Sequence, residues 1–146
     1  MRLLTIGDIA SLPKPIQEAL EKAKDATRAG MKLALVLALS YGGRDEIVRA
    51  ARKAAGDIAS GNLAFSALDE ERFTKYLDTA GVPDPDLIIR TAGEMRLSNF
   101  LPWQAAYAEF YATPVLWPDF TVQHLHEAIR NYGTRLRKFG GLVNTK

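Results

Sequence analysis

The sequence contains no cysteine, which excludes disulfide bonds and any thiolate-bound zinc or iron–sulfur centre. Metal ligands would have to be carboxylates or imidazoles. The two histidines, His124 and His126, are expected to be surface or boundary residues. The sequence also lacks a large excess of charge of either sign, because 19 basic and 17 acidic residues give a formal net charge of +2. This balance argues against a nucleic-acid partner, which requires a concentrated basic face.

Long apolar runs are missing as well. The apolar run at 33–39 is far shorter than the ~20 residues that a membrane helix needs. The chain also does not open with a charged segment followed by an apolar one, so no secretory signal is predicted. We therefore expect a soluble protein of the cytoplasm. A length of 146 residues suits one domain, and we expect a single α/β domain over residues 1–146.

The order of the predicted elements indicates a parallel sheet flanked by helices. Strands are predicted at 2–6, 33–39, 86–90 and 115–117. The 33–39 run is apolar throughout, which is typical of a strand buried on both faces. Helices are predicted at 16–29, 45–59, 68–79, 99–112 and 121–139. In the last helix we expect one buried face, formed by Val122, Leu125, Ile129, Tyr132, Leu136 and Phe139.

Ligands of an open parallel sheet bind beyond the carboxyl ends of its strands, and two segments there are rich in polar groups. The first places Ser40, Gly42, Gly43 and Arg44 at the start of a predicted helix. A phosphate would find backbone N–H groups, a positive helix end and a guanidinium group there. The alternative is a tight turn with a solvated arginine, and a pair of glycines does not decide between the two.

The second segment contains two arginines six residues apart. Arg90 and Arg96 flank Gly93, and Ser98 follows close to a predicted helix start. Two guanidinium groups and a hydroxyl could together satisfy the several oxygens of a diphosphate. The alternative is an exposed loop whose arginines pair with Glu94 and its neighbours.

The stretch from Leu97 to Phe120 is poor in charge and rich in aromatic residues. Its only charged residues are Glu109 and Asp119. It is either deep core or a large contact surface for another chain. A carboxylate in such a setting must pair, bind a metal or change its pKa, so Glu109 is either a candidate Mg²⁺ ligand or a paired structural carboxylate. One helical stripe is predicted to hold Trp103, Ala106, Tyr107 and Phe110.

These segments resemble the cis-prenyltransferases, the undecaprenyl diphosphate synthase family. The run RTAGEMRLSNF at 90–100 is highly specific. The sequence SYGGR at 40–44 and the segment from Trp103 to Phe120 also match. The resemblance extends over nearly the whole chain, from the opening 2–8 segment to the glycine pair at 140–141.

The resemblance implies an enzyme that uses Mg²⁺ to condense isopentenyl diphosphate with an allylic diphosphate, giving a cis-polyprenyl diphosphate. By carry-over, Arg90, Arg96 and Ser98 bind the diphosphate of isopentenyl diphosphate. Glu109 helps to hold the metal together with the paired subunit, and the stretch from Leu97 to Phe120 lies at a homodimer interface. Peripheral membrane contact through the lipid product is also implied.

One part of the family pattern is absent from these 146 residues. The N-terminal section of the family carries an Asp-Gly-Asn-Gly-Arg-Trp loop whose aspartate handles the metal and the allylic diphosphate, so the resemblance describes the C-terminal portion and leaves the fold incomplete at the N-terminus. No residue of this chain is therefore assigned as catalytic. The absence of the family's aspartate should lower the reaction rate by orders of magnitude. Three readings stay open: the carboxyl-terminal part of an elongating enzyme, a non-catalytic partner subunit, or an inert domain that dimerises.

Overall fold

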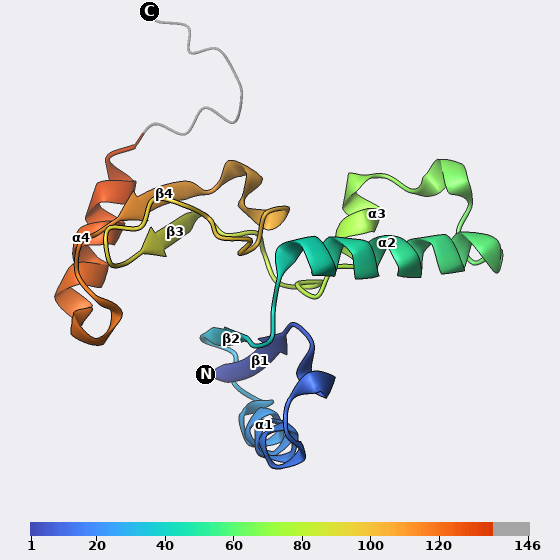
Figure 1. Ribbon diagram of the computed structural model, residues 1–146, viewed down its shortest axis with the longest axis horizontal. Helices are drawn as coiled ribbons and strands as arrows, with labels where there is room; N and C mark the ends of the chain where they lie inside the picture. The colour runs from blue at the N-terminus through green and yellow to red at the C-terminus, as the bar shows by residue number, and fades with distance from the viewer. Residues whose placement is uncertain (136–146) are drawn as a thin grey trace, which may run out of the picture. The chain divides into compact units, whose positions relative to one another are not determined.

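The computed structural model describes residues 1–135 and separates into two compact units, Met1–Pro83 and Asp84–Lys146. Each unit contains one pair of parallel strands and a helix that contacts one of them (Figure 1). The predicted α/β class with parallel strands is thus confirmed. The expectation of a single domain over residues 1–146 stays a prediction, and the two units are described separately.

The first unit begins with β1 (Arg2–Ile6), which pairs in parallel with β2 (Ala34–Ala38). The helix between them, α1 (Lys14–Thr27), contacts β1. The hydroxyl of Thr27 joins the two elements, because it donates to the carbonyl of Ala23 at 2.8 Å and accepts from the backbone N–H of Leu3 at 3.0 Å. The last turn of the helix is therefore attached to the first half of the strand.

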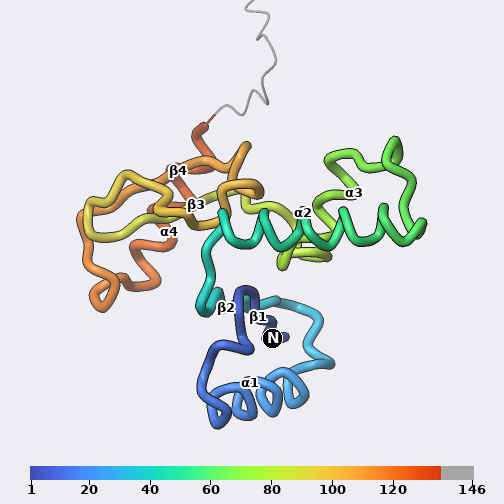
Figure 2. The backbone as a smooth tube through the Cα atoms, turned by 45° about the vertical axis from the view of Figure 1, so that its right-hand side comes forward, coloured from blue at the N-terminus to red at the C-terminus, as the bar shows by residue number. Residues whose placement is uncertain are grey.

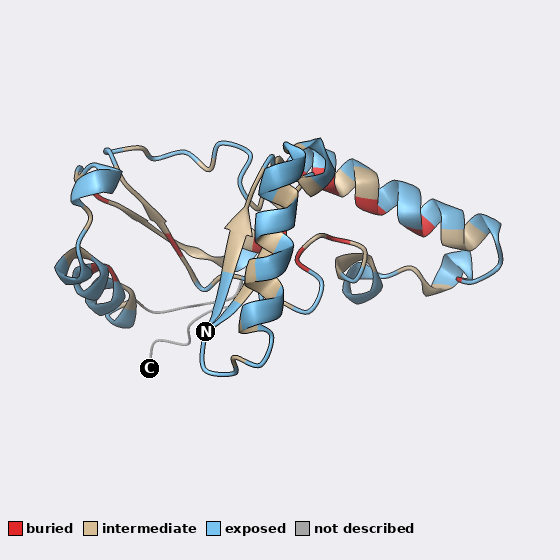
Figure 3. Cartoon of the chain, turned by 90° about the horizontal axis from the view of Figure 1, so that it is seen from below, coloured by how far each residue is buried: buried red, intermediate tan, exposed pale blue. Residues whose placement is uncertain are grey.

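The rest of the first unit is built on α2 (Gly43–Ala59) and the short α3 (Glu70–Thr74), which contact each other. Figure 3 shows the buried positions of α2 along one side of the long helix. They are spaced by three or four residues, as in an amphipathic helix, and are Gly43, Glu46, Ala50 and Ala54. Two 3-10 turns complete the unit, at Ile9–Ser11 and Phe65–Ala67.

The helix predicted over 68–79 is shorter than expected. Asp69 caps α3, since its side chain accepts from the backbone N–H of Arg72 at 2.8 Å. After Thr74 the chain continues in tight turns, in which Tyr76 and Leu77 donate to carbonyls three residues earlier. These turns lead the chain back toward β1, which a straight helix to residue 79 would not do.

The second unit pairs β3 (Leu87–Arg90) with β4 (Glu109–Ala112), again in parallel. The C-terminal helix α4 (Val122–Gly133) contacts β4, and Figure 2 shows the two close together. None of the helices within residues 1–135 has both the length and the apolar character needed to cross a bilayer.

The helix predicted over 99–112 is wrong. The backbone at Ser98, Asn99 and Leu101 has φ of 52°, 63° and 50°, and such left-handed residues cannot continue a right-handed helix. Only a 3-10 segment, Gln104–Tyr107, forms before β4 begins at Glu109. The four residues of the predicted helical stripe therefore do not share one helix. The strand predicted at 115–117 is also wrong: a 3-10 turn, Trp117–Asp119, contains Pro118, which cannot donate to a strand ladder.

Fewer apolar residues are buried than the sequence predicts. No residue of β2 is buried, and Leu35 is 40% exposed, because a two-stranded sheet beside one helix cannot have both faces covered. In α4 only Ala128 is buried, so the predicted buried face is wrong for Val122, Leu125 and Ile129, which are 66%, 39% and 50% exposed. Leu136 and Phe139 lie outside the described residues. The apolar core consists of Ile6, Ala50, Ala54, Leu63 and Leu77 in the first unit, and of Ile88 and Ala128 in the second.

Candidate functional site

The turn after β2 leads directly into α2, as the sequence predicts. Gly42 is the N-cap residue with an extended backbone, Gly43 is buried as the first helical residue, and Arg44 is exposed. A glycine cap has no side chain that could accept from the first-turn N–H groups. The positive end of a 17-residue helix is thus combined with an exposed guanidinium group, an arrangement that suits an anion.

Hydrogen bonds hold this turn from both sides. On one side the backbone N–H of Asp8 donates to the carbonyl of Ser40 at 3.2 Å, and the hydroxyl of Ser11 donates to that of Ser40 at 3.0 Å. On the other side the phenol of Tyr41 donates to Oε2 of Glu46 at 2.6 Å. The turn is therefore fixed to the loop after β1 and to the first turn of α2.

A network of charged residues lies behind the turn. Glu46 is only 1% exposed, and its Oε1 accepts from the backbone N–H of Asp78 at 2.9 Å. Arg49 donates to both carboxylate oxygens of Asp78, at 2.8 and 2.7 Å, and its Nε donates to Asp45 at 2.7 Å. The second carboxylate oxygen of Asp78 also accepts from the backbone N–H of Gly7 at 3.1 Å. One arginine and three carboxylates thus connect β1, α2 and the segment after α3.

The pKa shifts in this network follow from its geometry. The hydrogen bonds from Arg49 lower the pKa of the Asp78 carboxyl below its ordinary value, and its partial burial opposes this only in part. The hydrogen bonds to Asp78 and then to Asp45 raise the pKa of the Arg49 guanidinium. Both partners therefore stay ionised at neutral pH.

In the second unit, Arg90 and Arg96 are brought to one carboxylate. Arg90 ends β3, and its Nη2 lies 4.0 Å from Oε2 of Glu94. Nη2 of Arg96 lies 2.5 Å from the same oxygen. The side chain of Arg96 is 72% exposed and that of Arg90 only 28%. Pairing of the arginines with Glu94 was one of the two interpretations of this loop. The same geometry also places both guanidinium groups around one anionic oxygen, as diphosphate binding would require.

The backbone of this arginine loop is held against the segment after β4. The N–H groups of Ala92 and Gly93 donate to the carbonyls of Val115 and Thr113, each at 2.8 Å. Ser98 is exposed, with its backbone in the left-handed region, and the helix start predicted beside it does not form. Its role toward a diphosphate stays a prediction.

Glu109 forms an ion pair. Nη1 of Arg135 lies 2.7 Å from Oε2 of Glu109 and also donates to the carbonyl of Phe110 at 3.0 Å. Within residues 1–135, no group of three or more histidine or acidic side chains is arranged to hold a metal ion. Glu109 suits Mg²⁺ by donor type, because Mg²⁺ is bound through one or two carboxylates completed by substrate phosphates and water.

The stretch from Leu97 to Phe120 is not deep core. Its only buried residues in the structure are Gln104 and Thr113. Tyr107 and Trp117 are 68% and 75% exposed. This rules out the first of the two interpretations and leaves the contact surface as a prediction.

Sequence reasoning missed several residues of the first unit and one of the second. Glu46, Arg49 and Asp78 carry no motif, and their partners lie 29 to 71 residues apart. His124 is a boundary residue as expected, and in addition its Nδ1 accepts from the backbone N–H of Thr121 at 3.0 Å and closes a capping box on α4. The spacing of Thr121 and His124 around a helix start was the available signal.

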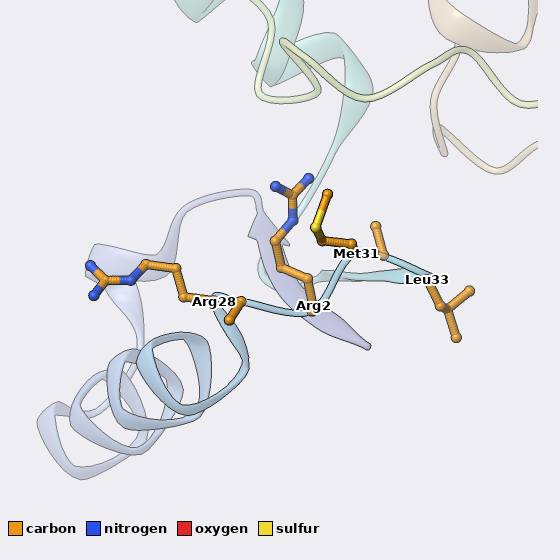
Figure 4. Close-up of a pocket in the computed structure, with 7 residues that line it drawn as sticks. Arg2, Arg28, Met31 and Leu33 are labelled. Carbon is orange, nitrogen blue, oxygen red and sulfur yellow. The ribbon is translucent and has the colours of Figure 1, made fainter.

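A cavity of about 470 Å³ lies at the amino ends of β1 and β2, away from the predicted residues of the first unit (Figure 4). Arg2 and Arg28 line it together with exposed Met31 and Leu33. It opens at the opposite ends of the strands from the turn at Gly42.

Comparison with known proteins identifies the family. A family model described as "Putative undecaprenyl diphosphate synthase" matches residues 1–140. The chain belongs to this family. The resemblance predicted from the RTAGEMRLSNF run is thus confirmed.

Relatives within the undecaprenyl diphosphate synthase family are close in sequence. The isoprenyl transferase of Streptococcus thermophilus strain CNRZ 1066 is 53% identical, over 97% of this chain and 59% of its own length. That of Chlamydia trachomatis serovar D is 49% identical, over 96% of this chain and 55% of its own length. The chain therefore spans somewhat more than half the length of these relatives.

Solved structures agree on the fold. Lavandulyl diphosphate synthase from Lavandula x intermedia, in complex with dimethylallyl diphosphate, superposes with a TM-score of 0.92 at 42% identity, over 95% of this chain and 60% of its own. A probable undecaprenyl diphosphate synthase from Campylobacter jejuni gives a TM-score of 0.81 at 37% identity, covering 95% of this chain and 62% of its own. Both neighbours are prenyl diphosphate synthases by name.

Proposed function

We propose that this chain provides the isopentenyl diphosphate site of a Mg²⁺-dependent cis-prenyltransferase, which condenses that substrate with an allylic diphosphate to give a cis-polyprenyl diphosphate. The observation that carries the proposal is the convergence of Arg90 and Arg96 on one oxygen of Glu94, inside the segment most specific to the family. A diphosphate presents oxygens of the same charge and hydrogen-bonding character.

Each residue has a distinct task in this proposal. Arg90, half-buried at the end of β3, orients one phosphate, and the exposed Arg96 closes over the other. Ser98 adds a hydroxyl donor. These three residues of the second unit hold isopentenyl diphosphate so that its double bond faces the allylic carbon, which is catalysis by positioning. In the first unit, taken by itself, the turn of Gly42, Gly43 and Arg44 is proposed as a further substrate-binding element that contacts diphosphate.

Mg²⁺ is the proposed cofactor, and it would neutralise diphosphate charge when bound. Glu109 is its proposed ligand in this chain. Arg135 orients the carboxylate of Glu109 through its hydrogen bond, and a bound cation would share that carboxylate with it. We also propose a location in the cytoplasm, with peripheral membrane contact through the lipid product.

Binding of isopentenyl diphosphate, measured by isothermal titration calorimetry, tests the proposal. Arg90→Gln and Arg96→Gln should each weaken binding about tenfold or more, because each removes a charge-assisted hydrogen bond worth about 1.5–3 kcal/mol. Arg130→Gln is the matched control: it removes a positive charge from α4 of the same unit. Equal weakening by all three variants would mean that only net charge attracts the ligand, and the assigned site would be wrong.

A second candidate is a non-catalytic subunit that works with another chain, and one observation favours it. Apolar residues are exposed on the second unit at Tyr107, Trp117, Val122 and Ile129. Such a surface fits the proposed homodimer contact through the stretch from Leu97 to Phe120, or a contact with a different chain.

An assay with labelled isopentenyl diphosphate, farnesyl diphosphate and Mg²⁺ separates the two candidates. Product formed by this polypeptide alone supports the enzyme. Product that appears only after mixing with a polypeptide carrying the Asp-Gly-Asn loop supports the subunit.

A further inference from the structure

We propose that Asp78 is a positioning residue for the turn formed by Gly42, Gly43 and Arg44, and that it sets the affinity of this turn for a diphosphate. The inference rests on the proposed function, in which the turn contacts diphosphate. Asp78 itself does not belong to the turn and lies more than thirty positions away from it in the sequence.

Three separate segments are attached to this one residue. Its carboxylate accepts from the backbone N–H of Gly7, where β1 has just ended, at 3.1 Å. The same carboxylate accepts two hydrogen bonds from Arg49 of α2, at 2.8 and 2.7 Å. Its backbone N–H donates to the buried carboxylate of Glu46, at 2.9 Å. The side chain of Asp78 is only 12% exposed, so water competes little for these bonds.

Two of these attachments, those through Glu46 and Gly7, lead directly to the turn. Glu46 uses its other oxygen to accept from the phenol of Tyr41, the residue immediately before Gly42. Gly7 lies against the carbonyl of Leu39, since a Cβ at Gly7 would be 2.2 Å from that oxygen. Asp78 thus links the strand end that precedes the turn with the helix that follows it. Removal of this link frees both flanks of the turn at once.

The charge of Asp78 makes the proposal distinguishable from a general electrostatic effect. A carboxylate near an anion site repels the anion, so its neutralisation alone would strengthen diphosphate binding. A positioning role predicts the opposite sign, because a misplaced turn loses hydrogen bonds to the ligand. The direction of the change in affinity therefore decides between the two.

The unit contains a matched control. Asp57 also accepts a hydrogen bond from a side chain, the phenol of Tyr76 at 2.7 Å, and it lies near the other end of α2. Asp57→Asn removes the same charge and one carboxylate acceptor oxygen from the same unit but leaves the links to Gly7 and Glu46 in place. A loss of stability alone would affect both variants alike.

The experiment measures binding of inorganic diphosphate to the full chain by isothermal titration calorimetry, at a temperature at which circular dichroism shows each variant folded. Asp78→Asn should weaken binding about tenfold, and Asp57→Asn should stay within about twofold of the unsubstituted chain. Arg49→Lys keeps the charge pair but loses the two-pronged geometry, so it should give an intermediate loss and serves if Asp78→Asn does not fold.

Two results would overturn the inference. Equal or tighter binding by Asp78→Asn would refute the positioning role while leaving the proposed function intact. If the unsubstituted chain does not bind inorganic diphosphate at all, the assignment of the turn in the proposed function fails and this inference fails with it.

Discussion

Replacement of Gly7 by alanine should destabilise the first unit strongly. Gly7 has φ of +100°, and an added Cβ would lie 2.2 Å from the carbonyl oxygen of Leu39, which is backbone and cannot rotate away. The unfavourable backbone costs about 1–2 kcal/mol. Displacement of the loop breaks the hydrogen bond from Gly7 to Asp78, worth roughly 1.5 kcal/mol or more because its acceptor is charged. The sum is about 3 kcal/mol, which lowers the midpoint of unfolding by roughly 12–24 °C in a unit of this size.

A thermal melt followed by far-ultraviolet circular dichroism measures this effect, with Gly61→Ala as the control. Gly61 also has a positive φ, of +79°, but no described atom lies within 4 Å of the Cβ that alanine would add. Its substitution should cost only about 1 kcal/mol, the backbone part alone. If the two variants melt within about 3 °C of each other, the close approach of Gly7 to Leu39 does not constrain the fold and the reasoning is refuted.

Three further predictions concern other contacts. Arg135→Gln should lower the free energy of unfolding in urea by about 1–3 kcal/mol, because Glu109 and a backbone carbonyl lose their donor; no change would mean that the pair is not formed in solution. His124→Ala should reduce helicity and cost about 0.5–2 kcal/mol by opening the capping box with Thr121, and unchanged helicity would contradict it. Because the folded-state pKa of Asp78 is lowered, its contribution to stability is complete above about pH 4 and is lost as the pH falls through that lowered pKa. Urea titrations from pH 7 to pH 2 should therefore show a smaller loss for Asp78→Asn than for the unsubstituted chain, and parallel curves would refute the assignment.

Local signals in the sequence predicted much of the fold and part of the candidate site. The glycine pair after an apolar run correctly indicated a helix there, although α2 begins at Gly43, two residues before the predicted start at 45. Asp69, which caps α3, stands before two glutamates, and this local pattern is typical of a helix start. The strand ending at Arg90 and the loop after it put both arginines of the RTAGEMRLSNF run where the structure has them. In each case, residues adjacent in the sequence contain all the information needed.

Prediction failed where distant residues or unusual backbone conformations decide the structure. The composition of 99–112 favours a helix, but left-handed residues at Ser98, Asn99 and Leu101 prevent it, and pairing with β3 turns Glu109–Ala112 into a strand. Asp78 could not be found because its importance comes from partners 71 and 29 positions away. Burial was overestimated because periodicity shows which face is apolar but not whether anything covers it.

The carboxylate of Glu94 lies between two guanidinium groups, those of Arg90 and Arg96. Under the proposed function, a diphosphate that enters this loop displaces an internal anion, and binding is an exchange of one set of ion pairs for another. The net attraction of the loop for a diphosphate is then smaller than that of two arginines paired only with water. The same carboxylate can pair with the arginines again as the ligand leaves. Glu94 thus competes with the diphosphate for both arginines, which favours release of the ligand over tight binding.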